Sequence, residues 1–200
     1  MPDESEQQGQ KEKRVNSNHE PSEQETQASP AEVYPPEHVT LRDGTEVTIR
    51  AIVPEDAPLL QELFRRLSPE SVFLRFLTRL KELSQTQAER LANVDYESKM
   101  ALVAALGPDL IGVARYAMME GERPGLAEAA VVVQDEYQSR GLGSLLLLRM
   151  VDYAREHGVE AFVASIHPSN ERIMRFVRKS GLRTDSSIEA GLWEIRVYLD

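Results

Sequence analysis

The sequence predicts an α/β protein with one mixed sheet of six to seven strands and helices on both faces. Short β-rich segments alternate with amphipathic segments along the chain. Three strands follow one another over residues 99–133, after which helices and strands alternate. Because consecutive hairpin strands pair antiparallel and a strand–helix–strand unit pairs parallel, the sheet should contain both kinds of pair.

The first 38 residues are predicted to form a disordered acidic tail, and the folded domain is expected over residues 39–200. Residues 1–38 contain nine acidic and three basic side chains and almost no large apolar ones. A segment of this kind buries too little apolar surface to offset the entropy that it would lose on ordering.

The first half of the domain is expected to hold one strand and three helices. Residues 46–52 alternate in polarity and are rich in β-branched side chains, which indicates a strand. A helix follows from Pro54, with leucine and phenylalanine at helical spacing. Shorter helices are expected from Pro69 and over residues 85–93, the second capped by Ser84.

The second half is expected to hold five strands and two helices. Its strands are mostly apolar, which is typical of strands that are covered on both faces. Gly158 follows the first helix, where a left-handed C-cap favours glycine. The expected strands are 99–106, 110–118, 126–133, 161–166 and 192–199, and the expected helices are 144–157 and 168–180.

The composition excludes several classes of function. The chain of 200 residues contains no cysteine, which rules out disulfides, thiolate-bound zinc and a cysteine nucleophile. No His, Asp and Glu cluster has metal-ligand spacing, so we expect no metal. The net charge of −10 argues against nucleic acid as a partner. The chain lacks both a membrane-spanning apolar run and a secretion signal, so we expect a cytoplasmic protein with no membrane partner.

The most informative segment joins the fourth expected strand to the helix after it. Gly141 and Gly143 stand just before that helix, whose first N–H groups are unpaired and lie at its positive end. Because glycine lets a ligand approach the backbone closely, the segment is suited to a pyrophosphate, with Arg140 adding a charge. The lysine of a P-loop is absent, and Leu146 replaces the third glycine of the dinucleotide fingerprint.

The same segment resembles the acyl-CoA-binding loop of the GCN5-related N-acetyltransferase (GNAT) family, Q/R-x-x-G-x-G/A, at Gln138, Gly141 and Gly143. Asn170, followed eleven residues later by Gly181, resembles a second element of that family. The resemblance covers roughly residues 47–198. It implies the GNAT fold, acetyl-CoA as cosubstrate, a primary amine as acceptor, and a monomer or homodimer.

The resemblance also implies how acetyl-CoA binds. The backbone of the fourth expected strand would pair with the pantetheine arm, and the N–H groups of the loop would bind the pyrophosphate. The implied acyl-CoA-binding residues are Val131, Val132, Val133, Gln138, Ser139, Arg140, Gly141, Leu142, Gly143, Ser144 and Asn170.

A narrower resemblance is to the acetyltransferase domain of Pat-type bacterial protein lysine acetyltransferases. It rests on residues 67–71, 74–76, 95–96, 100–104 and 127–129. This resemblance implies that the acceptor is a lysine side chain on a protein. It also places the general base at Glu128.

Glu128 is a candidate base on chemical grounds as well. It is the polar residue of an otherwise apolar strand and stands three residues before Val131. A lysine amine, with a pKa of about 10.4, must lose its proton before it attacks the thioester. We expect the strand to bury the Glu128 carboxylate and so to adjust its basicity.

The proton donor to the leaving CoA is not identified by the sequence. The family's tyrosine position corresponds to Val177, and His167 and Tyr137 are nearby alternatives. A basic face on the last helix is either solvated or in contact with the 3′-phosphate of CoA. Its members are Arg172, Arg175, Arg178 and Lys179.

Three alternative functions remain open from the sequence. The acceptor could be a small amine, such as a polyamine or an amino acid. The chain could instead be a non-catalytic acyl-CoA sensor, although a carboxylate at Glu128 has no purpose in a pure binding module. A scaffold with a disordered interaction arm would have no affinity for acyl-CoA.

Overall fold

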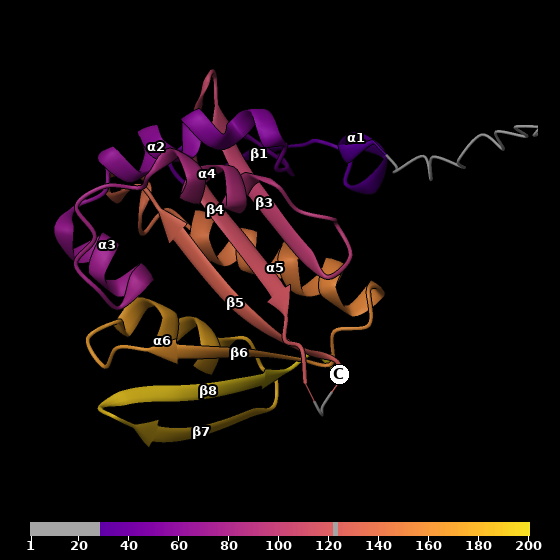
Figure 1. Ribbon diagram of the computed structural model, residues 1–200, viewed down its shortest axis with the longest axis vertical. Coiled ribbons are helices and arrows are strands. Elements are labelled where there is room, and N and C mark those ends of the chain that lie inside the picture. The colour runs from indigo at the N-terminus through magenta and orange to yellow at the C-terminus, as the bar shows by residue number, and fades with distance from the viewer. Residues whose placement is uncertain (1–28, 122–123) are drawn as a thin grey trace, which may run out of the picture.

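The computed structural model describes residues 29–121 and 124–200, which form one eight-stranded sheet with helices against it (Figure 1). The strands are β1 (Glu37–Thr40), β2 (Glu46–Ala51), β3 (Lys99–Leu106), β4 (Asp109–Met118), β5 (Leu126–Val133), β6 (Ala161–Ile166), β7 (Thr184–Glu189) and β8 (Leu192–Tyr198). The helices are α1 (Pro30–Val33), α2 (Ala57–Arg65), α3 (Pro69–Phe76), α4 (Gln85–Ala92), α5 (Leu142–Glu156) and α6 (Glu171–Lys179), with short 3-10 turns η1 (Pro54–Asp56) and η2 (Asp135–Tyr137).

The sheet is mixed, as predicted. Its strand order is β1-β2-β3-β4-β5-β6-β8-β7. The pair β5–β6 is parallel and the other six neighbouring pairs are antiparallel. The two parallel strands are connected through α5. Together the three elements form the strand–helix–strand unit predicted from the sequence.

The sheet is covered on both faces where β3, β4 and β5 run. In Figure 1, α2 and α4 pass in front of these strands and α5 lies behind them. Neighbouring residues of β4 face opposite helical layers. A Cβ added at Gly112 would lie 3.2 Å from Cδ1 of Leu146 on α5. Val113 instead lines a small cavity with Leu60 and Leu63 of α2. Because both faces of these strands are buried, their sequences are nearly continuous runs of apolar residues.

The prediction of a disordered tail was wrong for residues 29–38, which contain α1 and the start of β1. Side-chain contacts with α5 order this segment. The rings of Tyr34 and Tyr153 lie 6.3 Å apart, and Glu37 accepts hydrogen bonds from Arg149 at 2.6 and 2.8 Å. Residues 1–28 of the predicted tail lie outside the described residues.

β7 was also missed by the sequence analysis. It is a largely exposed edge strand with polar residues at most positions, so it lacks the apolar alternation of a half-buried strand. Its backbone pairs with β8 along its whole length. With β1 and β7 added to the six strands expected, the sheet has eight strands.

A buried ion pair joins β2 to the start of α2. Asp56 is 2% exposed. Its carboxylate accepts two hydrogen bonds from Arg50, both at 2.7 Å, and a third from the Val53 N–H at 2.9 Å. The pair therefore fixes the helical layer against one edge of the sheet.

We predict that Asp56→Ala lowers the free energy of unfolding by about 3–5 kcal/mol, because Arg50 loses its partner in a partly buried position. Urea unfolding followed by circular dichroism measures this change. As a control, Asp200→Ala removes the exposed 3.3 Å ion pair with Arg183 and should change stability by less than about 1 kcal/mol. Equal losses in the two variants would contradict the structural role given to Asp56.

Candidate active site

The active-site opening begins where β5 and β6 separate. Their parallel pairing runs over three residue pairs and ends at Glu128 and Val163. Beyond that point β5 continues to Val133 while still paired with β4 on its other side. Residues 129–133 therefore present toward β6 a backbone edge that is not paired with a strand, although the Val133 carbonyl accepts a hydrogen bond from the Gln138 side chain. Such an edge is suited to an extended ligand that carries amide groups.

A cleft of about 550 Å³ occupies this opening. Its walls come from β5, the loop before α5, the first turns of α5, and one side each of α3 and α6. The cleft brings together most of the acyl-CoA-binding residues predicted from the sequence. Those that line it are Val131, Val132, Val133, Gln138, Ser139, Gly141, Gly143, Ser144 and Asn170.

The loop ends at the N-terminus of α5, a helix of 15 residues that begins two residues earlier than expected. Gly141 has a φ of 96°, in the left-handed region that favours glycine. Leu145 donates to the Gly141 carbonyl at 3.0 Å. Within the described residues, the N–H groups from Ser139 to Ser144 have no acceptor. Free N–H groups at the positive end of a helix are a favourable site for phosphate oxygens.

Gln138 and Asp135 fix the loop against α3. The Gln138 amide donates to the Val133 carbonyl at 2.9 Å and to Ser71 Oγ at 3.0 Å. Asp135 accepts from the Ser68 N–H, the Ser68 hydroxyl and the Ser71 hydroxyl. Burial raises the pKa of Asp135, but these hydrogen bonds outweigh it and hold the pKa below the usual value for aspartate. The position of the loop thus depends on side chains of α3.

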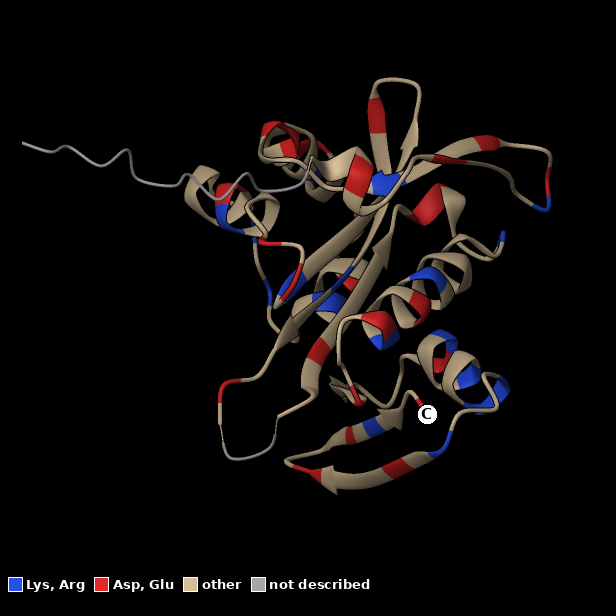
Figure 2. Ribbon diagram, turned by 90° about the vertical axis from the view of Figure 1, so that its right-hand side faces the viewer, with Lys and Arg blue, Asp and Glu red and all other residues tan. Residues whose placement is uncertain are grey.

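The cleft is strongly basic although the chain is acidic. Five of its lining residues are cationic and none is acidic, in a chain with a net charge of −10. Three of the five come from α6, where Lys and Arg positions are frequent along the ribbon (Figure 2). The five are Arg42, Arg75, Arg172, Arg175 and Lys179. A cleft with this charge attracts a polyanionic ligand.

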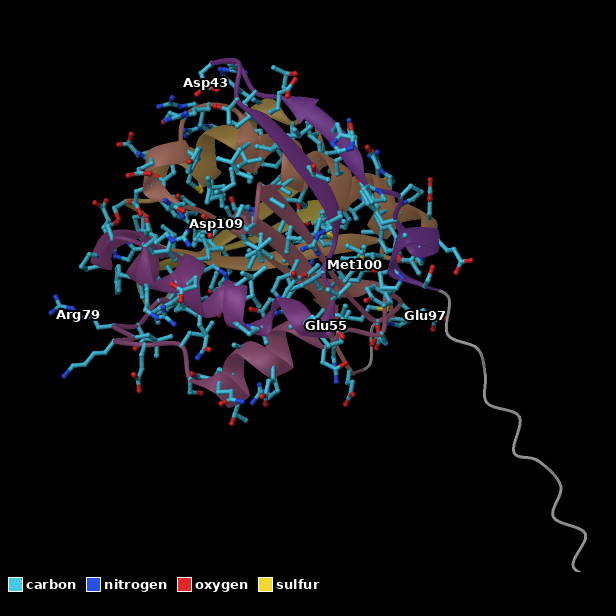
Figure 3. All side chains as sticks on the ribbon, turned by 90° about the horizontal axis from the view of Figure 1, so that it is seen from above. Asp43, Glu55, Arg79, Glu97, Met100 and Asp109 are labelled. Atoms are coloured by element: carbon cyan, nitrogen blue, oxygen red, sulfur yellow. The ribbon has the colours of Figure 1, made fainter. Side chains whose placement is uncertain are left out.

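Two predicted binding residues do not line the cleft. Leu142 is 1% exposed and packs in the core. Arg140 forms an ion pair with Asp43, at the tip of the β1–β2 hairpin (Figure 3). The neighbouring Arg42 takes the place expected for Arg140, with its Nε 3.4 Å from the position of a Cβ on Gly141. No sequence signal marks Arg42 as a cleft residue, because the hairpin precedes the loop by almost half of the chain.

Glu128 stands at the end of the cleft where the two strands meet, paired with Val163 across β5 and β6. Its side chain is exposed, so the prediction of a buried carboxylate was wrong. Arg115 of β4 is paired with Ala130, two residues along β5 from Glu128, and therefore shares its face of the sheet. The charge of Glu128 acts on Arg115 and on Arg75 of α3.

The other candidate residues have structural partners. The Asn170 side chain accepts from the Ile173 N–H at 3.3 Å and so caps α6, in addition to lining the cleft. The His167 ring lies 5.1 Å from the Phe73 ring, edge to face. The Tyr137 ring is covered by the Arg140 guanidinium at 5.0 Å. Neither His167 nor Tyr137 lines the cleft.

Within residues 29–121 and 124–200, no three His, Cys, Asp or Glu side chains are grouped as metal ligands. No helix of the same part is both long enough and apolar enough to cross a bilayer.

We predict that Gly141→Ala weakens the binding of acetyl-CoA about tenfold, because the methyl group strains the loop and crowds Arg42. Calorimetric titration measures the affinity. Gly44→Ala is the matched control: Gly44 also has a positive φ, of 88°, but lies in open space outside the cleft. It should lose similar stability and keep its affinity. If both variants lost affinity for acetyl-CoA, the cause would be general backbone strain, and the specific role of Gly141 in binding would be contradicted.

Comparison with known proteins agrees with this geometry. The model of the acetyltransferase (GNAT) family matches residues 60–182. An acetyltransferase of Pseudomonas aeruginosa is 35% identical over 140 residues, which cover 68% of this chain and 74% of that protein. The acetyltransferase Pat of Mycolicibacterium smegmatis is 30% identical over 146 residues, 72% of this chain and 43% of Pat.

A solved structure gives the same result. The crystal structure of the GNAT domain of S. lividans PAT matches with a TM-score of 0.77 and 29% identity, and the match covers 84% of this chain and 98% of that domain. The relationship to Pat-type acetyltransferases is therefore shown by both sequence and fold. The chain belongs to the GNAT family, as an acyl-CoA-dependent N-acyltransferase that uses acetyl-CoA.

Proposed function

We propose that this enzyme acetylates a lysine side chain on a protein, with Glu128 as the general base. The observation that carries the proposal is the position of Glu128, exposed at the point where β5 and β6 separate. An exposed carboxylate at that point can be reached by a long side chain that belongs to a large partner. The similarity to Pat-type acetyltransferases supports the same acceptor.

Acetyl-CoA would lie along the cleft with its phosphates at one end and its thioester at the other. The N-terminus of α5 and the cationic side chains of α6 and the β1–β2 hairpin would hold the phosphates. The pantetheine arm would pair with the free edge of β5. Val133 and Glu128 are five residues apart, or roughly 17 Å along a strand. An extended pantetheine arm that starts beside Val133 would therefore bring the acetyl group close to Glu128.

The chemistry explains why a carboxylate is needed there. At pH 7 only about one lysine in 2,500 carries a neutral amine, given a pKa of about 10.4. Glu128 accepts a proton from the ammonium group, directly or through a water molecule, and passes it to solvent. The neutral nitrogen then attacks the carbonyl carbon and a C–N bond forms. The nitrogen loses its second proton to Glu128, and the C–S bond breaks to release CoA as the thiolate.

A small amine with its own carboxylate, such as an amino acid, is the second candidate acceptor. Arg75 and Arg115 lie within electrostatic reach of Glu128 and would attract a carboxylate on the acceptor. The same two cations disfavour a polyamine, which carries only positive charge.

We predict that Glu128→Gln lowers turnover by about 10²–10⁴-fold, the usual contribution of a general base. Acetyl-CoA affinity should stay nearly unchanged, because Glu128 does not line the cleft. Release of CoA, measured with a thiol reagent at saturating amine, tests this. The control is Glu189→Gln on the exposed edge strand β7, which should keep wild-type turnover. Full turnover in Glu128→Gln would remove Glu128 from the mechanism.

We predict that lysine-containing peptides are acetylated with a kcat/KM at least about tenfold above free amino acids and spermidine, a difference of about 1.4 kcal/mol in transition-state binding. The same CoA-release measurement, with mass spectrometry to locate the new acetyl group, compares the three acceptor classes. Preference for free amino acids would favour the second candidate and overturn the protein-lysine assignment.

A further inference from the structure

Arg75 is a half-buried cation without an acidic partner among the described residues. It lies in the last turn of α3. The guanidinium carbon lies 4.7 Å from the centre of the Phe76 ring. Within residues 29–121 and 124–200, the Arg75 guanidinium forms neither an ion pair nor a hydrogen bond. Its position is therefore not explained by a structural charge partner.

The environment of Arg75 disfavours its charge. Burial, together with the nearby charge of Arg115, lowers the pKa of Arg75 to about 10, although the charge of Glu128 partly opposes this shift. Burial also lowers the pKa of Arg115. Two half-buried guanidinium groups next to each other cost free energy in the folded protein unless an anion joins them. Perturbed groups of this kind cluster at functional sites.

Arg75 lines the cleft beside β5 and lies within electrostatic reach of Glu128. Together with Val132 it lines both the large cleft and an inner cavity of about 40 Å³. The inner cavity also contains Arg115, while its other lining residues are apolar. Arg115 is paired with Ala130, between Glu128 and the β5 edge that faces the cleft. The remaining cations of the cleft lie on the β1–β2 hairpin and on α6.

The reaction needs a positive group at this place. As the C–S bond breaks, the sulfur of CoA takes the bonding electron pair and becomes a thiolate. Position 177 is valine, and neither His167 nor Tyr137 lines the cleft. Negative charge that develops in a reaction is stabilised by a fixed positive group nearby.

We propose that Arg75 is a catalytic residue whose guanidinium binds the sulfur of CoA and stabilises the leaving thiolate. The inference rests on the proposed function, in which acetyl-CoA lies along the cleft. In the step, the amine nitrogen forms a bond with the carbonyl carbon, and its proton goes to Glu128. The electron pair of the C–S bond goes to the sulfur, which pairs with Arg75. CoA leaves as the thiolate and is protonated by solvent.

The acidity of the thiol in bound CoA tests this assignment without any acceptor. Thiolate absorbance in the ultraviolet, followed as a function of pH, gives the pKa of CoA bound to each variant. A neighbouring arginine lowers the pKa of a thiol, because it stabilises the thiolate. We expect the pKa of the bound thiol to be about one unit lower in the wild type than in Arg75→Met.

The matched control is Arg79→Met, which removes an exposed arginine just after α3 that projects away from the body of the molecule (Figure 3). It should leave the pKa of the bound thiol at the wild-type value. The charge of Glu128 acts on the same site and opposes Arg75, so Glu128→Gln should lower the pKa further. Equal thiol pKa values in wild type and Arg75→Met would overturn the proposal, whatever the activities are.

Kinetics and stability separate this role from packing. Arg75→Met should lower kcat about 10²-fold with little change in the KM for acetyl-CoA, and Arg75→Lys should recover part of the loss. Guanidinium ion added to Arg75→Ala should restore turnover.

The melting temperature of Arg75→Met should not fall, because a half-buried unpaired charge is removed. A lower melting temperature without rescue by guanidinium would make Arg75 a packing residue. If wild-type protein transfers no acetyl group but still lowers the thiol pKa, only the proposed function fails.

Discussion

The parallel pairing between β5 and β6 stops at Glu128 and Val163, and the rest of the site depends on this interruption. β5 is held by β4 along its whole length, and β6 is held by β8 along its own, so neither strand can bend to close the gap. The backbone groups of residues 129–133 on that side are left for a ligand, because buried N–H and C=O groups require partners. The side chain at the last pair, Glu128, is placed at the end of the ligand's path.

The site also separates charge along its length. At one end, free N–H groups of α5 and cations from α6 and the β1–β2 hairpin surround a space with no acidic side chain. At the other end, a single carboxylate, Glu128, is placed near two guanidinium groups, Arg75 and Arg115. The first end is suited to phosphates, whose charge is permanent. The second is suited to a reaction in which a proton leaves the amine and negative charge arrives on sulfur.

The sequence was sufficient for those parts of the fold in which local signals agree. The apolar strands at 99–133, the glycines before α5 and the alternation of helix and strand predicted the mixed sheet and the loop correctly. β1 and β7 were missed because short or polar strands lack the alternation on which prediction depends. Tyr34 and Glu37 are ordered by contacts with α5, more than a hundred residues later in the chain.

The candidate site was predictable along its main chain and less so in its side chains. Nine predicted residues line one cleft: eight from the β5–α5 segment, and Asn170 at the start of α6. Their placement was predictable because glycine spacing and helix position determine the course of the backbone. Arg42 comes from an element that is distant in sequence, and no motif marks it. Arg75 belongs to residues 74–76, on which the narrower resemblance rests, but that resemblance gave it no role. Burial of Glu128 was predicted from its apolar strand, but the strand is open on one side exactly where β6 departs, which periodicity does not reveal.

Amide hydrogen exchange with and without saturating acetyl-CoA tests the central claim most directly. If the free edge of β5 and the start of α5 bind the ligand, exchange slows at residues 129–133 and 139–144, while the strands on the far side of the sheet, β1 and β2, change little. Unchanged exchange in both segments at saturation would contradict the account, because acetyl-CoA would then lie elsewhere on the protein.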